Sequence, residues 1–453
     1  MAKSKTAYIC QNCGAQSPKW IGRCPSCDAW NTYEEEIVIK SSKKERLAGL
    51  TSSTSKPELI DEISPAHTKR TSTRISEFDK ILGGGMVSGS VILIGGEPGI
   101  GKSTLMLQIA MMAKNQKVLY VSGEESPEQI KIRADRIGVT SSCYLLNETL
   151  LESILLHTSE LSPDMLIIDS IQTLFTEQLD STPGSISQVK ECASLLMKYS
   201  KQNNITTYLV GHINKSGNIA GPKVLEHIVD VVLQFEGDQH QLFRILRASK
   251  NRFGAASELA LFEMRGSGLR EVQNPSELLL SAGDENLSGT AVAAAIEGVR
   301  PFLIETQSLV SSAVYGTPQR SATGYDLRRL NMLLAVLEKR AGFRLASKDV
   351  FLNIAGGIKV SDPAIDLAVV AAILSSNQNV YIDKSICFAG EISLPGEIRP
   401  VSRIEQRITE ARKIGFKTIF ISRYHTKSLD LKKMKDIEVA PVGRVEELAG
   451  RLF

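Results

Sequence analysis

A glycine-rich segment, Gly96–Ser103, constrains the fold of this chain more than any other feature. Its sequence, GEPGIGKS, fits the pattern G-x-x-x-x-G-K-[ST] of a phosphate-binding loop. An apolar run over Val91–Ile94 precedes the loop, and a segment typical of a helix, Leu105–Ala110, follows it. A strand, a glycine loop and a helix in this order form the context in which such loops bind nucleotides. The alternative, a glycine-rich turn with no ligand, fits these flanking segments poorly.

The residues of this loop differ in what they can do for a nucleotide. Glycines let backbone N–H groups close around phosphate oxygens, and the start of the following helix adds partial positive charge. Lys102 would reach the β- and γ-phosphates of ATP, and the Ser103 hydroxyl would hold Mg²⁺. We therefore expect ATP and Mg²⁺ as cofactors and ATP hydrolysis as the activity. The expected nucleotide-binding residues are Gly96, Glu97, Pro98, Gly99, Ile100, Gly101, Lys102, Ser103 and Thr104.

Length and composition indicate a protein of several domains. The 453 residues are too many for one hydrophobic core and suit about three domains of typical size. Apolar runs such as Val369–Leu374 are far shorter than the ~20 residues of a membrane-spanning helix. The basic start, Met1–Lys5, is not followed by the apolar stretch of a secretory signal. We expect a cytoplasmic protein with no membrane partner.

Four cysteines near the start of the chain form two C-x-x-C pairs. Cys10 and Cys13 make the first pair, and Cys24 and Cys27 make the second. Two such turns can present four thiolates to one ion in the tetrahedral geometry of a Zn²⁺ site. The alternative is a pair of redox motifs, but a thioredoxin-type motif belongs to a βαβ unit, which is missing here. The expected zinc role is structural, because four thiolates leave no open coordination position.

Composition also predicts how the chain is divided. Residues 1–39 should form the Cys₄ zinc-binding module, and residues 40–65 a linker rich in Ser, Thr, Lys and Glu. Residues 66–275 should form an α/β ATPase domain, and residues 276–453 a C-terminal α+β domain.

Acidic residues follow two predicted strands of the ATPase domain. Lys117–Ser122 is followed by Glu124 and Glu125, and the apolar strand Met165–Asp169 ends in a carboxylate. Ligands of open α/β sheets bind outside the carboxyl ends of strands. Asp169 fits the Walker B position, which holds Mg²⁺ beside the nucleotide. Glu124 or Glu125 could activate the attacking water, or the pair could stabilise the start of the next helix. The position of the two glutamates does not favour either interpretation over the other.

Further polar residues come at the end of the next strand and after the last two. The strand Ile205–Val210 leads to His212, which could sense phosphate, couple to DNA or be a satisfied structural histidine. Strands near Ile228–Phe235 and Leu242–Ala248 precede Lys250–Gly254, which reads KNRFG. Taken together, the elements predict a mostly parallel, twisted sheet with flanking helices. Without further context, the charges of KNRFG would be a solvated cluster.

At this point the chain resembles the bacterial RadA/Sms DNA-repair ATPases over essentially its whole length. The resemblance rests on the four-cysteine module, the GEPGIGKS loop and, most specifically, the KNRFG segment. It implies a RecA-type core, homo-hexameric rings and DNA-stimulated, helicase-like ATP hydrolysis that promotes branch migration of recombination intermediates. The implied partners are single-stranded and branched DNA and a RecA-type recombinase filament.

The same resemblance implies roles for individual residues. Lys102 acts on the phosphates, and Glu124 matches the glutamate that activates water. Lys250 and Arg252 match groups that act on a neighbouring subunit's nucleotide or on DNA.

The C-terminal domain should contain an amphipathic helix with a basic face. Its apolar stripe is Leu327, Leu330, Leu333, Leu334 and Leu337. The basic residues in and around the helix are Arg328, Arg329, Lys339, Arg340, Arg344 and Lys348. This face is either solvated or a contact surface for the phosphate backbone, and the resemblance favours DNA contact. A strand is expected before it, near Arg300–Val310.

From about Val350 onward, the chain resembles the proteolytic domain of Lon proteases. Ser361–Ala364 and Gly390–Ser393 carry this resemblance. The peptidase needs a serine after the proline and an activating lysine further on. Here the serine position is Ala364, and the aligned lysine position is Glu405. Ring assembly and DNA contact are therefore expected in place of proteolysis.

Two alternatives to a DNA motor remain open. An ATP-dependent protease is one, and Ala364 argues against it. A RecA-like ATP switch that scaffolds protein partners is the other, since zinc modules often bind proteins. Stimulation of ATP hydrolysis by single-stranded DNA would discriminate between the motor and the switch.

Overall fold

The chain folds into two compact units, Met1–Val272 and Gln273–Phe453. The computed structural model describes residues 4–10, 14–39, 59, 70–138, 143–212, 223–236, 243–256, 258–274, 276, 279–280, 287–313, 317–427, 429 and 436–453. Cys13 and, apart from Leu59, the predicted linker over residues 40–65 lie outside this set. In the part of the chain so described, no helix combines the length and apolarity that a membrane span requires.

The first described residues form a small antiparallel sheet. Strand β1 (Ser4–Cys10) pairs on one side with β2 (Gln16–Ser17) and on the other with β3 (Tyr33–Ile39). In the register of β1 and β3, Cys10 lies opposite Tyr33. The sheet therefore carries one of the cysteines at the end of its central strand.

A long twisted sheet forms the centre of the ATPase core. Among the described residues it has nine strands in the order β14-β13-β12-β11-β6-β10-β9-β7-β8. The strands from β11 to β8 run parallel, and β12, β13 and β14 continue the sheet in antiparallel fashion. This confirms the predicted mostly parallel sheet. The bounds are β6 (Val91–Gly96), β7 (Val118–Ser122), β8 (Cys143–Asn147), β9 (Met165–Asp169), β10 (Thr206–His212), β11 (Val231–Glu236), β12 (Phe243–Asn251), β13 (Leu259–Arg265) and β14 (Gly268–Glu271).

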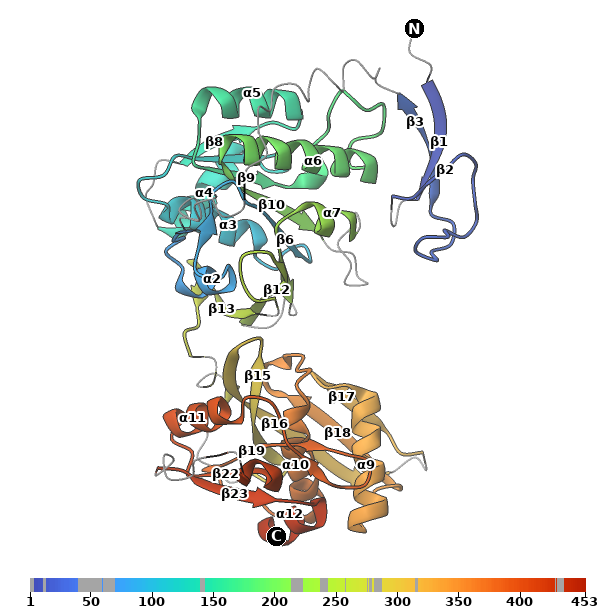
Figure 1. Ribbon diagram of the computed structural model, residues 1–453, viewed down its shortest axis with the longest axis vertical. Helices are drawn as coiled ribbons and strands as arrows, with labels where there is room; N and C mark the ends of the chain where they lie inside the picture. Colours follow the sequence, from blue (N-terminus) through green and yellow to red (C-terminus); the bar gives the residue numbers. More distant parts are fainter. Residues whose placement is uncertain are drawn as a thin grey trace. The chain divides into compact units, whose positions relative to one another are not determined.

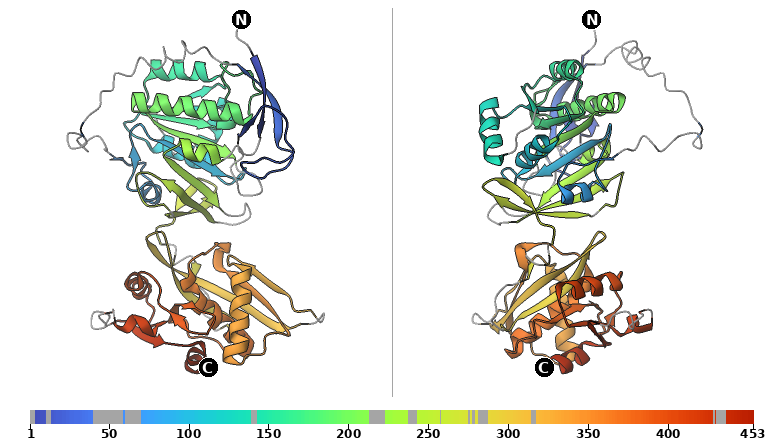
Figure 2. Two further views of the ribbon diagram at one scale, coloured as in Figure 1. Left: turned by 45° about the vertical axis from the view of Figure 1, so that its right-hand side comes forward. Right: turned by 90° about the vertical axis from the view of Figure 1, so that its left-hand side faces the viewer.

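Helices cover both faces of this sheet, as Figures 1 and 2 show. Side chains of a strand alternate between the two faces. Ile92 and Ile94 of β6 pack with α2, α3 and α4, whereas Val91 and Leu93 pack with α5, α6 and α7. The central strands are therefore buried on both sides, which explains their continuous apolar runs. The helices are α2 (Ser76–Ile81), α3 (Lys102–Met112), α4 (Pro127–Ile137), α5 (Leu151–Leu161), α6 (Ile186–Asn203) and α7 (Lys223–Ile228).

The start of α4 shows how local sequence sets the end of an element near the site. The Ser126 hydroxyl accepts a hydrogen bond from the Gln129 backbone N–H, and the Gln129 side chain accepts one from the Ser126 N–H. Pro127 occupies the first turn, where its missing N–H costs nothing. This reciprocal capping ends the loop after β7 at a fixed point.

The C-terminal unit is built on a second mixed sheet. Its described strands follow the order β17-β18-β16-β15-β19-β22-β23. Thr306 of β16 contacts the Ala368 carbonyl of α10, whereas Leu303 of the same strand packs with α11, so these helices cover opposite faces. The bounds are β15 (Thr290–Glu297), β16 (Arg300–Ser312), β17 (Arg320–Thr323), β18 (Lys348–Ile354), β19 (Ile386–Ala389), β22 (Thr418–Ser422), β23 (Glu438–Val442), α9 (Leu327–Ala341), α10 (Asp366–Gln378), α11 (Ile404–Ile414) and α12 (Val445–Leu452).

The predicted amphipathic helix is α9, with two differences from its expected faces. Leu330, Leu333, Leu334 and Leu337 are buried as predicted, but the side chain of Leu327 at the start of the helix is 43% exposed. Arg329, assigned to the basic face, is instead paired with the buried Asp366. The described exposed cations of this region are Arg328, Lys339, Arg340 and Arg344.

Candidate nucleotide-binding and catalytic site

The loop Gly96–Ser103 joins the end of β6 to the start of α3. Gly101 caps α3 in a left-handed conformation, with φ of 117°, which favours glycine. A Cβ atom at Gly101 would also lie 2.9 Å from the Met264 side chain. The tight turn points the first backbone N–H groups of α3 outward from the carboxyl end of β6, the edge where open α/β sheets bind ligands. This cradle fits a phosphate chain.

Lys102 is buried at the start of α3 and donates to three acceptors. Its ammonium group lies 2.8 Å from the Gly96 carbonyl, 2.9 Å from the Glu97 carbonyl and 3.3 Å from His212 Nδ1. Burial lowers the pKa of Lys102 to about 8, against the opposing effect of the nearby carboxylates, among them Asp169 and Glu124. The side chain therefore lies at the loop, where it would meet phosphate oxygens.

Asp169 ends β9 beside the loop. Its carboxylate accepts hydrogen bonds from the Tyr120 hydroxyl at 2.5 Å and from Ser103. Burial raises the pKa of Asp169, although both hydrogen bonds oppose the shift. A hydroxyl and a carboxylate at one point are oxygen ligands of the kind that Mg²⁺ takes together with waters and phosphates. The donor set thus fits the metal expected with ATP.

The two glutamates after β7 point to different neighbours. The Glu124 carboxylate accepts a hydrogen bond from the Ser170 hydroxyl at 2.6 Å and lies 3.3 Å from His212 Nε2. The Glu125 carboxylate instead pairs with Arg133 of α4. Burial would raise the pKa of Glu124, but the hydrogen bonds from Ser170 and His212 hold it below the usual value. The structure therefore brings Glu124, rather than Glu125, to the Lys102 side of the sheet edge.

Lys250 and Arg252 do not join this group in the same chain. Lys250 Nζ donates to the Glu226 carbonyl within the last turn of α7, at 2.6 Å, and to the Val229 carbonyl just beyond that helix, at 2.7 Å. Burial and the neighbouring Arg252 charge lower the pKa of Lys250. Arg252 pairs at 3.2 Å with Asp230, whose carboxylate also accepts from the Val91 N–H at the start of β6. Both cations therefore lie at the amino end of β6, opposite the phosphate-binding loop.

The rest of the KNRFG segment is held against the turn that precedes the short strand β5 (Met86–Val87). The Asn251 amide donates to the Ile81 carbonyl at 3.1 Å, and the Phe253 carbonyl accepts from Arg70 at 2.6 Å. A Cβ atom at Gly254 would lie 2.9 Å from the Gly83 Cα atom, so the two backbones touch. The segment is thus part of the fold of the core as well as a carrier of two cations.

Three of the four expected zinc ligands cluster in the N-terminal module. The thiols of Cys10, Cys24 and Cys27 lie within 4.8 Å of one another, with 3.7 Å between Cys10 and Cys27. The same backbone pattern recurs at both pairs, since the Cys10 N–H donates to Ala15 O and the Cys24 N–H to Ala29 O. Closely spaced thiols of this kind fit a structural Zn²⁺ ion. Cys13 lies outside the described residues.

Two polar residues of the nucleotide site escaped the sequence reasoning. Tyr120 stands inside a strand, where a tyrosine reads as core, and Ser170 follows the carboxylate that drew attention to β9. The alternation of side chains along β7 was the available signal for Tyr120. It places Tyr120 on the same face of the strand as the polar residue Ser122. Neither residue belongs to a recognisable motif.

The Lon-like segment of the C-terminal unit holds an ion pair between Arg407 and Asp362. Ala364, at the position where the resemblance to Lon proteases would require a serine, is fully buried. Glu405, aligned with the lysine position, is exposed. The α11 residue that reaches this segment is Arg407, which is 1% exposed and lies 2.5 Å from Asp362. Glu405 and Arg407 are two positions apart on α11, about 200° around the helix axis, so their side chains face different directions.

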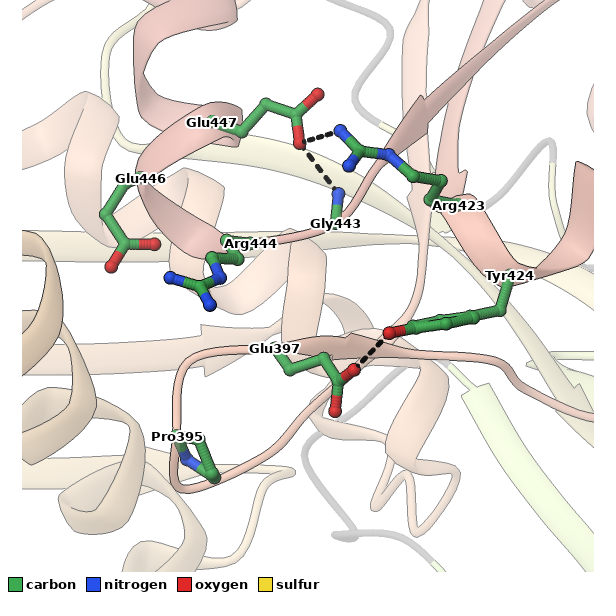
Figure 3. Close-up of a pocket in the computed structure, with 8 residues that line it drawn as sticks. All are labelled: Pro395, Glu397, Arg423, Tyr424, Gly443, Arg444, Glu446 and Glu447. Carbon is green, nitrogen blue, oxygen red and sulfur yellow. Dashed lines mark hydrogen bonds and ion pairs between the residues drawn. The ribbon is translucent and has the colours of Figure 1, made fainter.

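A polar cavity of about 740 Å³ lies at the carboxyl ends of β22 and β23 (Figure 3). Its wall contains internal pairs, since Glu397 accepts from the Tyr424 hydroxyl at 2.5 Å and Glu447 pairs with Arg423 at 2.7 Å. It belongs to the C-terminal unit, whereas the Lys102 site belongs to the other. None of the residues that line the cavity belongs to that site.

Comparison with known proteins agrees with this description. Three protein-family models match: the KaiC ATPase over residues 71–151, the rubredoxin metal binding domain over residues 8–35, and the ChlI subunit of Mg-chelatase over residues 306–425. The solved structure of the KaiC-like protein PH0186 from Pyrococcus horikoshii is 19% identical, covers 45% of this chain and 99% of its own, and has a TM-score of 0.38.

Curated relatives match the chain from end to end. The DNA repair protein RadA of Bacillus subtilis is 48% identical over 99% of this chain and 98% of its own length. The DNA repair protein RadA of Streptococcus pyogenes serotype M1 is 48% identical over 100% of both chains. The family models thus place a zinc ribbon, a KaiC-type ATPase core and a ChlI-like C-terminal domain in this order along the chain. The chain belongs to the RadA family of DNA repair proteins.

Proposed function

We propose that this chain is a DNA-dependent, helicase-like ATPase that works in the cytoplasm. It moves along single-stranded and branched DNA and promotes branch migration of recombination intermediates. The observation that carries the proposal is the meeting of Lys102, Glu124 and Asp169 at the carboxyl edge of one sheet, in a chain of the RadA family.

The residues at the carboxyl ends of these strands have different roles in ATP hydrolysis. Lys102 binds and neutralises the phosphates, which is the main demand of phosphoryl transfer. Glu124, kept ionised by its hydrogen bonds, orients the attacking water and takes its proton. Mg²⁺ held through Ser103 and Asp169 would add charge neutralisation when bound. Tyr120 keeps the Asp169 carboxylate directed at this point.

We further propose that the active unit is a homo-hexameric ring. Lys250 and Arg252 lie at the amino end of β6, so they can meet the Lys102 edge only from another copy of the chain, or else they contact DNA. The exposed cations on and after α9, Arg328, Lys339, Arg340 and Arg344, would contact the phosphate backbone of DNA. A RecA-type recombinase filament is the proposed protein partner.

ATP hydrolysis by the purified full-length protein, with and without single-stranded DNA at low salt, tests the proposal. We expect turnover to rise with DNA and to disappear in Lys102→Ala, because the phosphates lose their buried cation. Lys114→Ala, an exposed lysine just after α3, is the matched control. Turnover that ignores DNA would favour an ATP switch that scaffolds protein partners. Hydrolysis retained by Lys102→Ala would place the site elsewhere.

A further inference from the structure

His212 lies between two residues of opposite charge in the nucleotide site. It ends β10, which runs between the loop strand β6 and the Asp169 strand β9. Its Nδ1 atom lies 3.3 Å from Lys102 Nζ, and its Nε2 atom lies 3.3 Å from a carboxylate oxygen of Glu124. One imidazole ring therefore connects the phosphate-binding lysine to the proposed base.

The partners of the ring fix where its proton lies. An ammonium group can only donate, so Nδ1 must accept from Lys102 and carry no hydrogen. A neutral imidazole then has its N–H at Nε2, which donates to the Glu124 carboxylate. The two ring nitrogens thus serve different residues, and each contact can be removed separately.

All three hydrogens of the Lys102 ammonium group are used in hydrogen bonds in this arrangement. Its three N–H groups go to the Gly96 carbonyl, the Glu97 carbonyl and His212 Nδ1, at 2.8, 2.9 and 3.3 Å. A phosphate that binds the lysine must therefore displace at least one acceptor. The contact with His212 is the longest of the three and so the easiest to exchange.

Glu124 is held at one oxygen by two donors. The Ser170 hydroxyl lies 2.6 Å from Oε1, and His212 Nε2 lies 3.3 Å from the same atom. Both contacts leave Oε2 directed elsewhere and available for a water proton. Orientation of a base through such neighbours determines how well it meets the reacting water.

We propose that His212 is a positioning residue with two separable contacts. Through Nε2 it orients Glu124 for the attacking water, and through Nδ1 it restrains Lys102 until a phosphate displaces the ring. This inference rests on the proposed roles of Lys102 and Glu124, and it adds how the resting site is held before the nucleotide arrives.

Three substitutions separate the two contacts in the full-length protein. His212→Gln places an amide near the Nε2 position and keeps a donor to Glu124. His212→Asn places an amide oxygen near the Nδ1 position and keeps an acceptor for Lys102. His212→Ala removes both. The measurements are kcat for ATP hydrolysis and Kd for a fluorescent, slowly hydrolysed ATP analogue with Mg²⁺.

The expected pattern distinguishes positioning from a structural role. His212→Ala and His212→Asn should lower kcat on the order of 10²-fold, since the base is misplaced. His212→Gln should keep kcat close to that of the unmodified protein. In the Ala and Gln variants, Kd should fall about two- to tenfold, because the phosphate no longer has to displace the hydrogen bond between Lys102 and the ring, a change that matches one ordinary hydrogen bond. In the Asn variant, which keeps an acceptor for Lys102, Kd should stay unchanged. His157→Ala, an exposed histidine of α5, is the control and should change neither value.

Other outcomes overturn the inference. If Gln fails to restore kcat, or if all three variants lose turnover and affinity together, His212 supports the fold only. If Lys102→Ala and Glu124→Gln are inactive but His212→Ala stays within about twofold of normal turnover, the positioning role alone is wrong. If Lys102→Ala or Glu124→Gln hydrolyses ATP normally, the proposed site itself fails.

Discussion

At the scale of single residues, Glu124 and Glu125 show how neighbours separate two identical side chains. Glu125 pairs with Arg133 of α4, whereas Glu124 accepts hydrogen bonds from Ser170 and His212, which hold its pKa below the usual value against the effect of burial. Arg133 thus holds the Glu125 carboxylate at α4, whereas Ser170 and His212 hold the Glu124 carboxylate at the nucleotide site. The chemistry should therefore depend on Glu124.

We predict that Glu124→Gln abolishes most ATP hydrolysis but leaves ATP binding intact. Loss of a general base costs about 10²- to 10⁴-fold in rate, whereas the phosphate contacts of the loop are unchanged. Turnover and the affinity for an ATP analogue measure the two effects. Glu125→Gln is the matched control and should keep most of the turnover. An equal loss in both variants would show that the pair acts through the fold of the loop.

How far single residues can be predicted from sequence depends on whether a local pattern carries them. Lys102 and Asp169 stand in local patterns, a glycine loop and an apolar strand end, so their neighbourhood was predictable. Arg329 was misread because helical spacing shows which face a residue occupies, but not that Asp366, 37 positions away, would face it. Arg407 was missed in the same way, since its partner Asp362 lies 45 residues earlier. Pairing across long sequence separations is a property of the tertiary fold.

At the scale of elements, α9 is tied to α10 through one buried charge. Asp366 is 0% exposed at the start of α10 and accepts hydrogen bonds from the Tyr325 hydroxyl at 2.6 Å and from the Arg329 guanidinium. The backbone N–H of Ile392 completes its partners at 3.1 Å. A buried carboxylate of this kind depends on its cation, because an unpaired charge in the interior is costly.

We predict that Arg329→Ala destabilises the C-terminal unit by about 3–5 kcal/mol, the cost of leaving a buried charge unpaired. Arg328→Ala, on the exposed side of the same turn, should change stability by less than about 0.5 kcal/mol. Urea unfolding of both variants, followed by circular dichroism, measures the difference. Equal midpoints for the two variants would mean that Asp366 is held by Tyr325 and the Ile392 N–H alone.

The zinc module is an element whose stability should come from its metal. Its described core, Cys10, Cys24 and Tyr33 with a few packed neighbours, is too small to fold by hydrophobic burial alone. We predict about one Zn²⁺ per chain in the purified protein and none in Cys24→Ser. Cys143→Ser, a cysteine of β8, is the control and should keep the metal.

Metal content and intrinsic fluorescence check this prediction together. The chain has only two tryptophans, Trp20 and Trp30, and both belong to the zinc module. Tryptophan emission of the full-length protein therefore reports on this module alone. Both indoles are already exposed, so chelation should change chiefly the intensity of the emission, because the Arg23 guanidinium no longer stays 5.8 Å from the Trp30 ring, while ATP hydrolysis without DNA continues. An unchanged spectrum after complete removal of zinc would contradict a structural role.

Helices and strands were predicted well where their burial produced a recognisable pattern of apolar residues in the sequence. Six strands of the ATPase core, β6, β7, β9, β10, β11 and β12, were placed within a few residues, since buried strands read as continuous apolar runs between turn residues, whereas β8, β13 and β14 were not predicted. In the C-terminal unit, β15 was not recognised as a strand, because a run of alanines has no strong preference for strand or helix. Helix α10 also lacked a period, since nearly all of its residues are buried.

At the scale of the whole molecule, the residues proposed to act in ATP hydrolysis lie at opposite ends of the strands of one sheet. Lys102 follows the carboxyl end of β6, whereas Lys250 and Arg252 lie at its amino end beside Asp230. One strand thus separates the two groups within a chain. If both serve the same nucleotide, one group must come from a second copy, as head-to-tail rings provide.

We predict that mixing two inactive variants restores part of the DNA-stimulated ATP hydrolysis. Lys102→Ala lacks the phosphate cation but keeps Lys250, and Lys250→Ala has the reverse defect. In a mixed ring, some interfaces combine an intact Lys102 from one chain with an intact Lys250 from its neighbour, and these sites can turn over. Neither variant alone should be active, although Lys250→Ala should still bind an ATP analogue, because its own loop is unaltered. Activity should rise with the time allowed for subunit exchange.

If the mixture stays inactive after exchange is demonstrated, Lys250 does not act on a neighbour's nucleotide, and its bonds to the Glu226 and Val229 carbonyls then indicate a structural role.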